Sequence, residues 1–155
     1  MKLSNNLTLA EATKSATAIR KEIDNTPHGD HLDNLMAIAQ DIFQPIREHF
    51  GIPIAITSGY RSEALNEAIG GSKTSQHSKG EALDLDADVF GGVTNKDIFE
   101  FILDNLDFDQ LIWEFGNSNN PAWVHVSYKK SGGNRGQVLV AKKNSNGKTI
   151  YEHWA

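Results

Sequence analysis

Apolar residues recur at intervals of three and four between His31 and Phe50, which is the spacing of one face of an α-helix. The pattern predicts a long helix with a kink at Pro45 and an end at Gly51. Its apolar positions are Leu32, Leu35, Met36, Ile38, Ala39, Ile42, Phe43, Ile46 and Phe50. We interpret the Met and Phe side chains of this stripe as core.

Three shorter helices are expected elsewhere in the chain. Thr8 stands three residues before Glu11 in the arrangement of a capping box, which predicts a helix running to about Ile23. A second helix is expected over residues 63–69. A third is expected over residues 95–105, after a loop in which Thr94 or Asn95 caps its start.

Short segments rich in β-branched and aromatic residues predict strands. They cover residues 53–57, 83–86, 107–115, 123–128, 137–142 and 149–153. A polar loop over residues 116–121 joins the third segment to the fourth, and this predicts an antiparallel hairpin. Helices and strands together indicate the α+β class.

The composition narrows the classes of partner. A chain of 155 residues without repeats or linkers is expected to form one domain, residues 1–155. Its net charge of −5 argues against a nucleic-acid or anionic-membrane partner. A mildly basic C-terminal region is interpreted as a solvated face; its members are Lys129, Lys130, Arg135, Lys142 and Lys143.

Neither thiolate chemistry nor membrane insertion is expected. The chain has no cysteine, so nitrogen and oxygen atoms must hold any metal. The N-terminus lacks the basic-then-apolar order of a secretory signal, and no apolar run approaches the roughly 20 residues of a membrane span. We therefore expect synthesis in the cytoplasm. No feature of the sequence indicates an oligomeric state.

One histidine and one aspartate mark a candidate metal site. His77 lies in a polar, glycine-containing loop, and Asp84 follows on the strand into which that loop leads. With His125 on a second strand, these side chains would make a three-ligand zinc site with an open fourth position. The spacing of His77 and Asp84 alone also fits a loop histidine beside a solvated or capping aspartate.

Further polar groups are predicted near this site. Alternate strand residues share a face, so Trp123 and His125 point to one side of their strand. On the partner strand Glu114 could lie beside His125, depending on the register. Arg61, at the end of a strand, is either a solvated cation or, near a metal, a group that binds a substrate carboxylate or carbonyl.

Three motifs in this order resemble the zinc D-Ala-D-Ala carboxypeptidase family of peptidoglycan peptidases, especially its small phage and prophage members. They are Ser58-Gly59-Tyr60-Arg61-Ser62, the pair His77 and Asp84 preceded by Ser75, and Trp123-Val124-His125-Val126-Ser127. The resemblance extends from Leu7 to about Tyr128. It implies the Hedgehog/DD-peptidase α+β fold, with helices packed on an antiparallel sheet.

The resemblance also implies roles for individual residues. One zinc per chain would be held by His77, Asp84 and His125, with Arg61 as the substrate-side cation. In several relatives the general base lies three residues before the last histidine, where this chain has Ala122. Glu114 is our geometric replacement for it, and the weaker candidates are Asp86 and Glu81. We interpret Asp86 instead as an acceptor that orients a ligand histidine.

The expected activity is hydrolysis of an amide bond in peptidoglycan stem peptides, by a carboxypeptidase acting on D-Ala-D-Ala or an endopeptidase acting on L-Ala-D-Glu. Arg61, Ser75, Tyr60 and Trp123 are the expected substrate contacts. The enzyme would act on the cell wall after phage-type release or as part of a virion. The alternative, suggested by Ala122, is an inactive zinc-containing module that binds peptidoglycan or protein.

Overall fold

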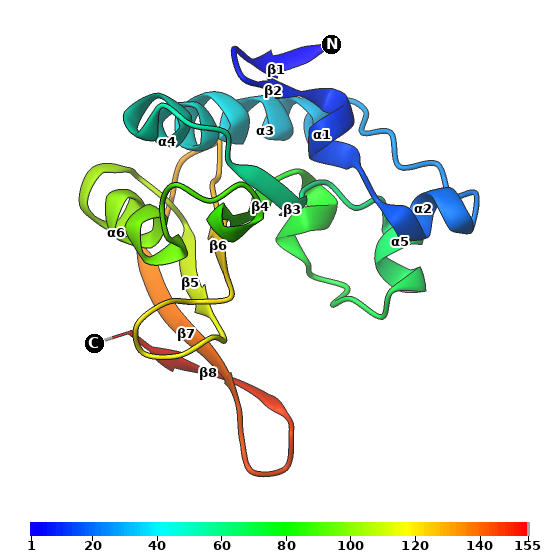
Figure 1. Ribbon diagram of the computed structural model, residues 1–155. Helices are drawn as coiled ribbons and strands as arrows, with labels where there is room; N and C mark the ends of the chain where they lie inside the picture. The colour runs from blue at the N-terminus through cyan, green and yellow to red at the C-terminus, as the bar shows by residue number, and fades with distance from the viewer. Residues whose placement is uncertain (155) are drawn as a thin grey trace.

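A six-stranded sheet forms the centre of the computed structural model, which describes residues 1–154 (Figure 1). The strand order is β3-β4-β6-β5-β7-β8, and β1 and β2 form a separate two-stranded sheet. The strands are β1 (Lys2–Ser4), β2 (Leu7–Thr8), β3 (Ala55–Ser58), β4 (Ala82–Asp86), β5 (Gln110–Glu114), β6 (Trp123–Ser127), β7 (Gln137–Lys143) and β8 (Thr149–His153). The predicted hairpin of β5 and β6 is confirmed. β5 pairs with β7 in parallel, whereas the other neighbouring strands of the large sheet are antiparallel.

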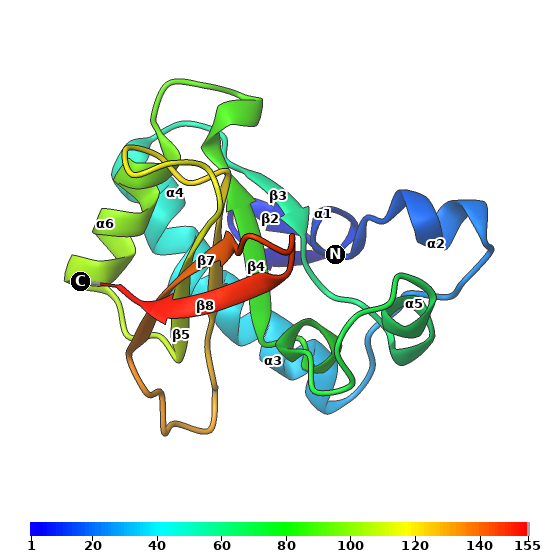
Figure 2. The ribbon, with the colours of Figure 1, turned by 90° about the horizontal axis from the view of Figure 1, so that it is seen from below.

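Helical segments cover one side of this sheet and flank it, which confirms the α+β class. In order they are α1 (Leu9–Thr13), α2 (Ala16–Arg20), α3 (Asp30–Ile38), the π-helical segment η1 (Ala39–Phe43), α4 (Gln44–Phe50), α5 (Glu63–Ala68), the 3₁₀ turns η2 (Gln76–Lys79) and η3 (Ala87–Val89), and α6 (Asn95–Asn105). In Figure 2, α2 and α5 lie together on one side of the molecule, and α6 lies on the opposite side. Among residues 1–154, no helix is both long enough and apolar enough to cross a membrane.

The long helix predicted from the apolar stripe is present as α3, η1 and α4. The backbone stays right-handed through both junctions, and Gly51 ends the helix in the left-handed conformation, as predicted. The expected disturbance at Pro45 takes the form of a π-helical turn immediately before it. Proline lacks the N–H that would bond four residues back, so a wider turn there leaves room for its ring.

The N-terminal helix is shorter than predicted. The capping box of Thr8 and Glu11 is present, with each side chain bonded to the other residue's backbone. Lys14 then adopts an extended conformation, and Ser15 caps a second helix by accepting from the backbone N–H of Ala18. The prediction of one helix to Ile23 was wrong, because serine competes well for a cap position and poorly for a helix interior.

Alternation along the central strands separates a core face from a cleft face. Leu83 and Leu85 of β4 and Val124 and Val126 of β6 belong to the buried core that contains the residues of α3, α4 and α6. The residues between them point to the other face, which no helix layer covers, and there they line a cleft. Asp84 and His125, two of the predicted metal ligands, therefore lie on this second face.

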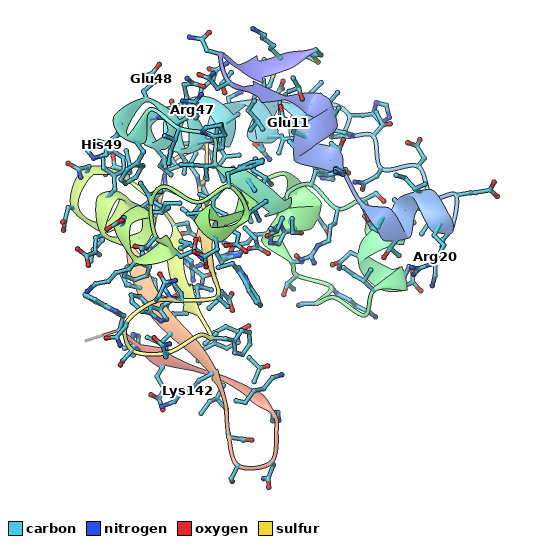
Figure 3. All side chains as sticks on the ribbon, viewed as in Figure 1. Glu11, Arg20, Arg47, Glu48, His49 and Lys142 are labelled. Carbon is cyan, nitrogen blue, oxygen red and sulfur yellow. The ribbon has the colours of Figure 1, made fainter. Side chains whose placement is uncertain are left out.

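The histidine of α4 has a structural contact. Figure 3 shows Arg47, Glu48 and His49 projecting from this helix. The imidazole of His49 stacks on Phe101 of α6, with ring centroids 4.3 Å apart and planes inclined by 24°. This contact joins the two helices that cover the core.

Candidate metal centre

His77, Asp84 and His125 come together at the floor of the cleft. His77 lies in the 3₁₀ turn η2, whereas Asp84 and His125 lie directly opposite each other on the antiparallel strands β4 and β6. Both histidines are buried, with 4% and 9% of their surface exposed. A loop and two strands thus bring into one cluster the three residues predicted from the sequence.

The spacing of the donor atoms fits a zinc ion. Asp84 Oδ1 lies 3.4 Å from His77 Nε2 and 3.0 Å from His125 Nδ1. One donor atom from each of the three residues lies within 4.8 Å of the others. Tetrahedral bonds of about 2.0–2.1 Å separate neighbouring donors by about 3.3 Å, so only small movements are needed to coordinate the ion. Two imidazoles and a carboxylate are also a donor set that zinc accepts in catalytic sites.

A backbone carbonyl fixes the orientation of His77. Its Nδ1 donates to the carbonyl oxygen of Gly59 at 2.7 Å, which leaves the lone pair of Nε2 directed at Asp84. Gly59 lies so close to α1 that a Cβ at this position would collide with the carbonyl oxygen of Ala12. A side chain at residue 59 would therefore displace the acceptor that selects the tautomer of His77.

Asp84 is held as a carboxylate. Burial alone would raise the pKa of its side chain, but the neighbouring imidazoles of His125 and His77 keep the pKa well below its ordinary value. The centre therefore presents a negative charge between two imidazoles. This is the charge pattern that a divalent cation requires.

Glu114 lies beside the cluster on the cleft face. The register places Ile112 opposite His125 and Glu114 opposite Trp123, so Glu114 is the diagonal neighbour of His125. Burial raises the pKa of Glu114 to about 7, with His125 lowering it and Asp84 raising it. A carboxyl group with a pKa near neutrality can both accept and return a proton.

Arg61 lines the cleft, and among residues 1–154 its guanidinium makes one side-chain hydrogen bond. One terminal nitrogen donates to Ser75 Oγ at 3.2 Å, and within the described part of the chain its buried Nε has no acceptor. Burial lowers the pKa of the guanidinium, and the charge of Asp84 opposes this. A guanidinium with unused donors at a cleft wall is suited to bind an anionic or carbonyl oxygen.

Two aromatic residues predicted to contact substrate have different positions. Trp123 lines the cleft and packs on Phe115, with ring centroids 5.4 Å apart. Tyr60 is instead buried in the core, where its hydroxyl lies 3.2 Å from His31 Nδ1. Its backbone N–H bonds to Ala12, which turns the side chain inward and leaves Arg61 as the cleft residue of this motif.

The two weaker candidates for the general base, Glu81 and Asp86, lie in different places. Glu81 lines the cleft. Asp86 does not orient a ligand histidine, because its carboxylate accepts from the side chain of Asn95 and from the backbone of Asp88 at the far end of β4. Ala122 is exposed and carries no polar side-chain atom, whereas Glu114 is the diagonal neighbour of His125 on the cleft face.

Sequence reasoning missed three polar residues beside the centre. Gln76 contacts His125 Nε2, Asp109 contacts Gln76, and Arg135 binds Asp109. Arg135 and Lys129 were interpreted as part of a solvated basic face, yet both pair with the buried carboxylate of Asp109. No periodic pattern links these residues, and only the position of Gln76 directly before His77 could have drawn attention to it.

The cleft has a volume of about 950 Å³, which is enough for several residues of a peptide. The metal cluster and Glu114 line this cleft. Its lining also includes Arg61, several residues between Ser72 and Glu81, the start of β7 and the exposed ring of Tyr151 on β8.

Comparison with known proteins points to the same chemistry. The family model described as Peptidase M15 matches residues 5–127, a range that contains the three clustered residues, Arg61 and Glu114. β7 and β8 lie outside the matched range. No curated protein matches the chain.

Proposed function

Because the chain belongs to the peptidase M15 family, we propose that it is a zinc peptidase that hydrolyses an amide bond in peptidoglycan stem peptides. The observation that carries this proposal is the convergence of His77, Asp84 and His125 on the floor of an open cleft, beside a buried carboxylic acid. Zinc is the cofactor of M15 peptidases, and the donor set and spacing fit one ion per chain.

Bound zinc would supply Lewis acidity at the scissile carbonyl. Glu114 would take a proton from the attacking water and pass it to the leaving amine, which its raised pKa favours. This role does not require a carboxylate at position 122, because the side chain of Glu114 reaches the cleft from β5, the strand next to β6. Because the carboxyl group of Glu114 is buried, few water molecules can reach it and exchange its proton.

Substrate positioning falls to the walls of the cleft. Arg61 would bind a carboxylate of the stem peptide or the oxygen of its scissile carbonyl, with Ser75 fixing the guanidinium. Trp123 would pack against apolar parts of the peptide. On this proposal the enzyme acts on the cell wall, after phage-type release or as part of a virion.

Digestion of purified muropeptides, with products identified by mass, tests the proposal. Loss of a single terminal alanine would identify D-Ala-D-Ala carboxypeptidase activity, whereas separation between L-Ala and D-Glu would identify an endopeptidase. His77→Ala is expected to lose either activity together with zinc. Intact muropeptides after incubation with the zinc-loaded wild type would contradict the proposal.

A second candidate is a zinc-containing module that binds peptidoglycan or protein without cleaving it. Ala122, at the position of the base in several relatives, is the observation that favours it. The two functions differ in one readout, because the module would retain muropeptides on an affinity column and leave their masses unchanged. The carboxyl group of Glu114 in the cleft makes the peptidase our conclusion.

A further inference from the structure

The nitrogen of His125 that faces away from the metal cluster meets a side-chain amide. His125 Nε2 lies 3.3 Å from Gln76 Oε1, and Gln76 Nε2 lies 2.9 Å from Asp109 Oδ2. The backbone of Gln76 is also fixed, since its carbonyl accepts from the N–H groups of Gly80 and Glu81. One amide thus spans the distance between a histidine of the centre and a buried carboxylate.

At Asp109 the direction of the hydrogen bonds is unambiguous, because a carboxylate can only accept. Asp109 is fully buried and accepts from Arg135 Nε at 2.9 Å, from a terminal nitrogen of Arg135 at 2.8 Å and from its backbone N–H at 3.1 Å. These bonds lower the pKa of Asp109 to about 2 against the effect of burial. A carboxylate only accepts hydrogen bonds, so the group that Gln76 turns toward it must be the NH₂ group.

The orientation of the Gln76 amide in turn determines which nitrogen of His125 carries the proton. With the NH₂ group of Gln76 directed at Asp109, its carbonyl oxygen faces His125. A carbonyl oxygen also only accepts, so Nε2 of His125 must carry the ring proton. Nδ1 is left with its lone pair pointing at Asp84 Oδ1, 3.0 Å away.

Asp84 opposes the tautomer of His125 with the proton on Nε2. Its carboxylate is itself an acceptor for a proton on Nδ1, so Asp84 and Gln76 compete for the single proton of a neutral imidazole. Nδ1 can bind a metal only when the proton is on Nε2. For His77 the carbonyl oxygen of Gly59 is 2.7 Å from Nδ1, closer than Asp84 Oδ1 is to Nε2 (3.4 Å), and it favours the opposite tautomer.

We propose that Gln76 is a positioning residue which, held by Asp109 and Arg135, keeps the proton of His125 on Nε2 and so keeps Nδ1 available to the metal. This inference rests on the metal site of the proposed function. It also gives the segment after residue 127 a part in metal binding, because Arg135 belongs to that segment and holds Asp109. The network raises zinc affinity without contacting the ion.

The test uses Gln76→Met, which keeps the length of the side chain and removes both hydrogen bonds. Long-range ¹H–¹⁵N NMR of the metal-free, ¹⁵N-histidine-labelled protein at mildly alkaline pH reports the tautomer of each imidazole. The wild type is expected to carry the proton of His125 on Nε2, and the variant on Nδ1, bonded to Asp84. His77 should keep its proton on Nδ1 in both proteins, which also reports an intact fold.

Zinc affinity, measured by competition with a chromophoric chelator, provides the second readout. Gln76→Met is expected to weaken binding about 10- to 100-fold. Gln110→Met is the matched control, because Gln110 lines the same cleft but donates to Gln137 at 2.7 Å instead of contacting a histidine.

An unchanged His125 tautomer in Gln76→Met, with unchanged zinc affinity, would overturn the inference. So would loss of zinc affinity in Gln110→Met equal to that in Gln76→Met, because the effect would then not depend on the bond to His125. Neither readout involves peptide cleavage. Failure of the proposed peptidase activity is therefore separable from failure of the positioning role.

Discussion

Asp84 and His125 face each other across β4 and β6, with Asp84 Oδ1 3.0 Å from His125 Nδ1. Rigid strands fix this pair, and the turn η2 brings His77 to the same carboxylate oxygen. The centre is thus built largely on the sheet, whose pairing restricts the movement of two of its three residues. This rigidity favours binding of a metal ion with a strict geometry.

Asp84→Asn is expected to reduce zinc affinity by at least about 100-fold, because it replaces the charged donor between two imidazoles by a neutral amide. Chelator competition measures the loss. The increase in melting temperature on adding zinc should disappear with it. Asp86→Asn, two residues along the same strand, is the control and should bind zinc as the wild type does. Equal zinc affinity in both variants would contradict the ligand assignment.

Glu114→Gln is expected to lower kcat on muropeptides by about 10²- to 10⁴-fold while zinc content stays at one per chain. The amide has nearly the same shape but cannot take the proton of the attacking water. Glu81→Gln is the matched control, since Glu81 also lines the cleft, and it should keep most of the activity. Full activity in Glu114→Gln would assign the base elsewhere.

The raised pKa of Glu114 also predicts how stability changes with pH in the metal-free protein. The ordinary pKa is 4.5 and the folded-state value is about 7, so between these values the folded state holds a proton that the unfolded state has released. The free energy of unfolding should therefore fall as pH rises from about 4.5 to about 7, by about 3 kcal/mol from this group. Urea titrations of wild type and Glu114→Gln would show the difference. Parallel profiles would mean that Glu114 titrates normally.

Arg135→Met is expected to destabilise the protein by about 1.5–3 kcal/mol, because Asp109 loses its hydrogen bonds to a charged group. It removes the bidentate partner of Asp109, whose side chain is fully buried. Lys130→Met removes a charge from the same basic segment at an exposed position and should change stability by less than about 0.5 kcal/mol. Urea denaturation of the two variants measures both effects. Similar values for the two would indicate that the pair with Asp109 contributes little.

Arg61→Met is expected to reduce kcat/KM about 10²-fold or more, because the guanidinium lines the cleft and is suited to bind a substrate oxygen. Comparing muropeptides that have a free carboxylate with their amidated counterparts shows whether Arg61 binds the carboxylate or the scissile carbonyl oxygen. If Arg61 binds the carboxylate, amidation should weaken the wild type strongly and the variant hardly at all. An unchanged kcat/KM for the carboxylate substrate in Arg61→Met would exclude a role in binding.

The sequence contained most of the information for the centre. Alternation along two strands was enough to place Trp123 and His125 on one face, and the pairing of β5 with β6 then brought Glu114 onto it. His77 was identified because a loop histidine preceded a strand aspartate. These inferences depend on periodicity and on local turn chemistry, which neighbouring residues determine.

Other features depend on contacts between distant segments. Gln76 and Asp109 are 33 residues apart, and Arg135 follows 26 residues after Asp109, so no local pattern connects them. The inward turn of Tyr60 follows from the packing of its strand end against α1. The parallel pairing of β7 with β5 depends on the path of residues 128–136, which has no periodicity of its own.

Zinc titration of the metal-free protein, with muropeptide cleavage followed by mass, tests directly whether the chain is a zinc peptidase. We predict that metal removal abolishes cleavage, that activity returns and saturates at one zinc per chain, and that Asp84→Asn shows no return at the same zinc concentration. Cleavage that persists in protein verified to be free of metal, or no cleavage at full zinc occupancy, would contradict it.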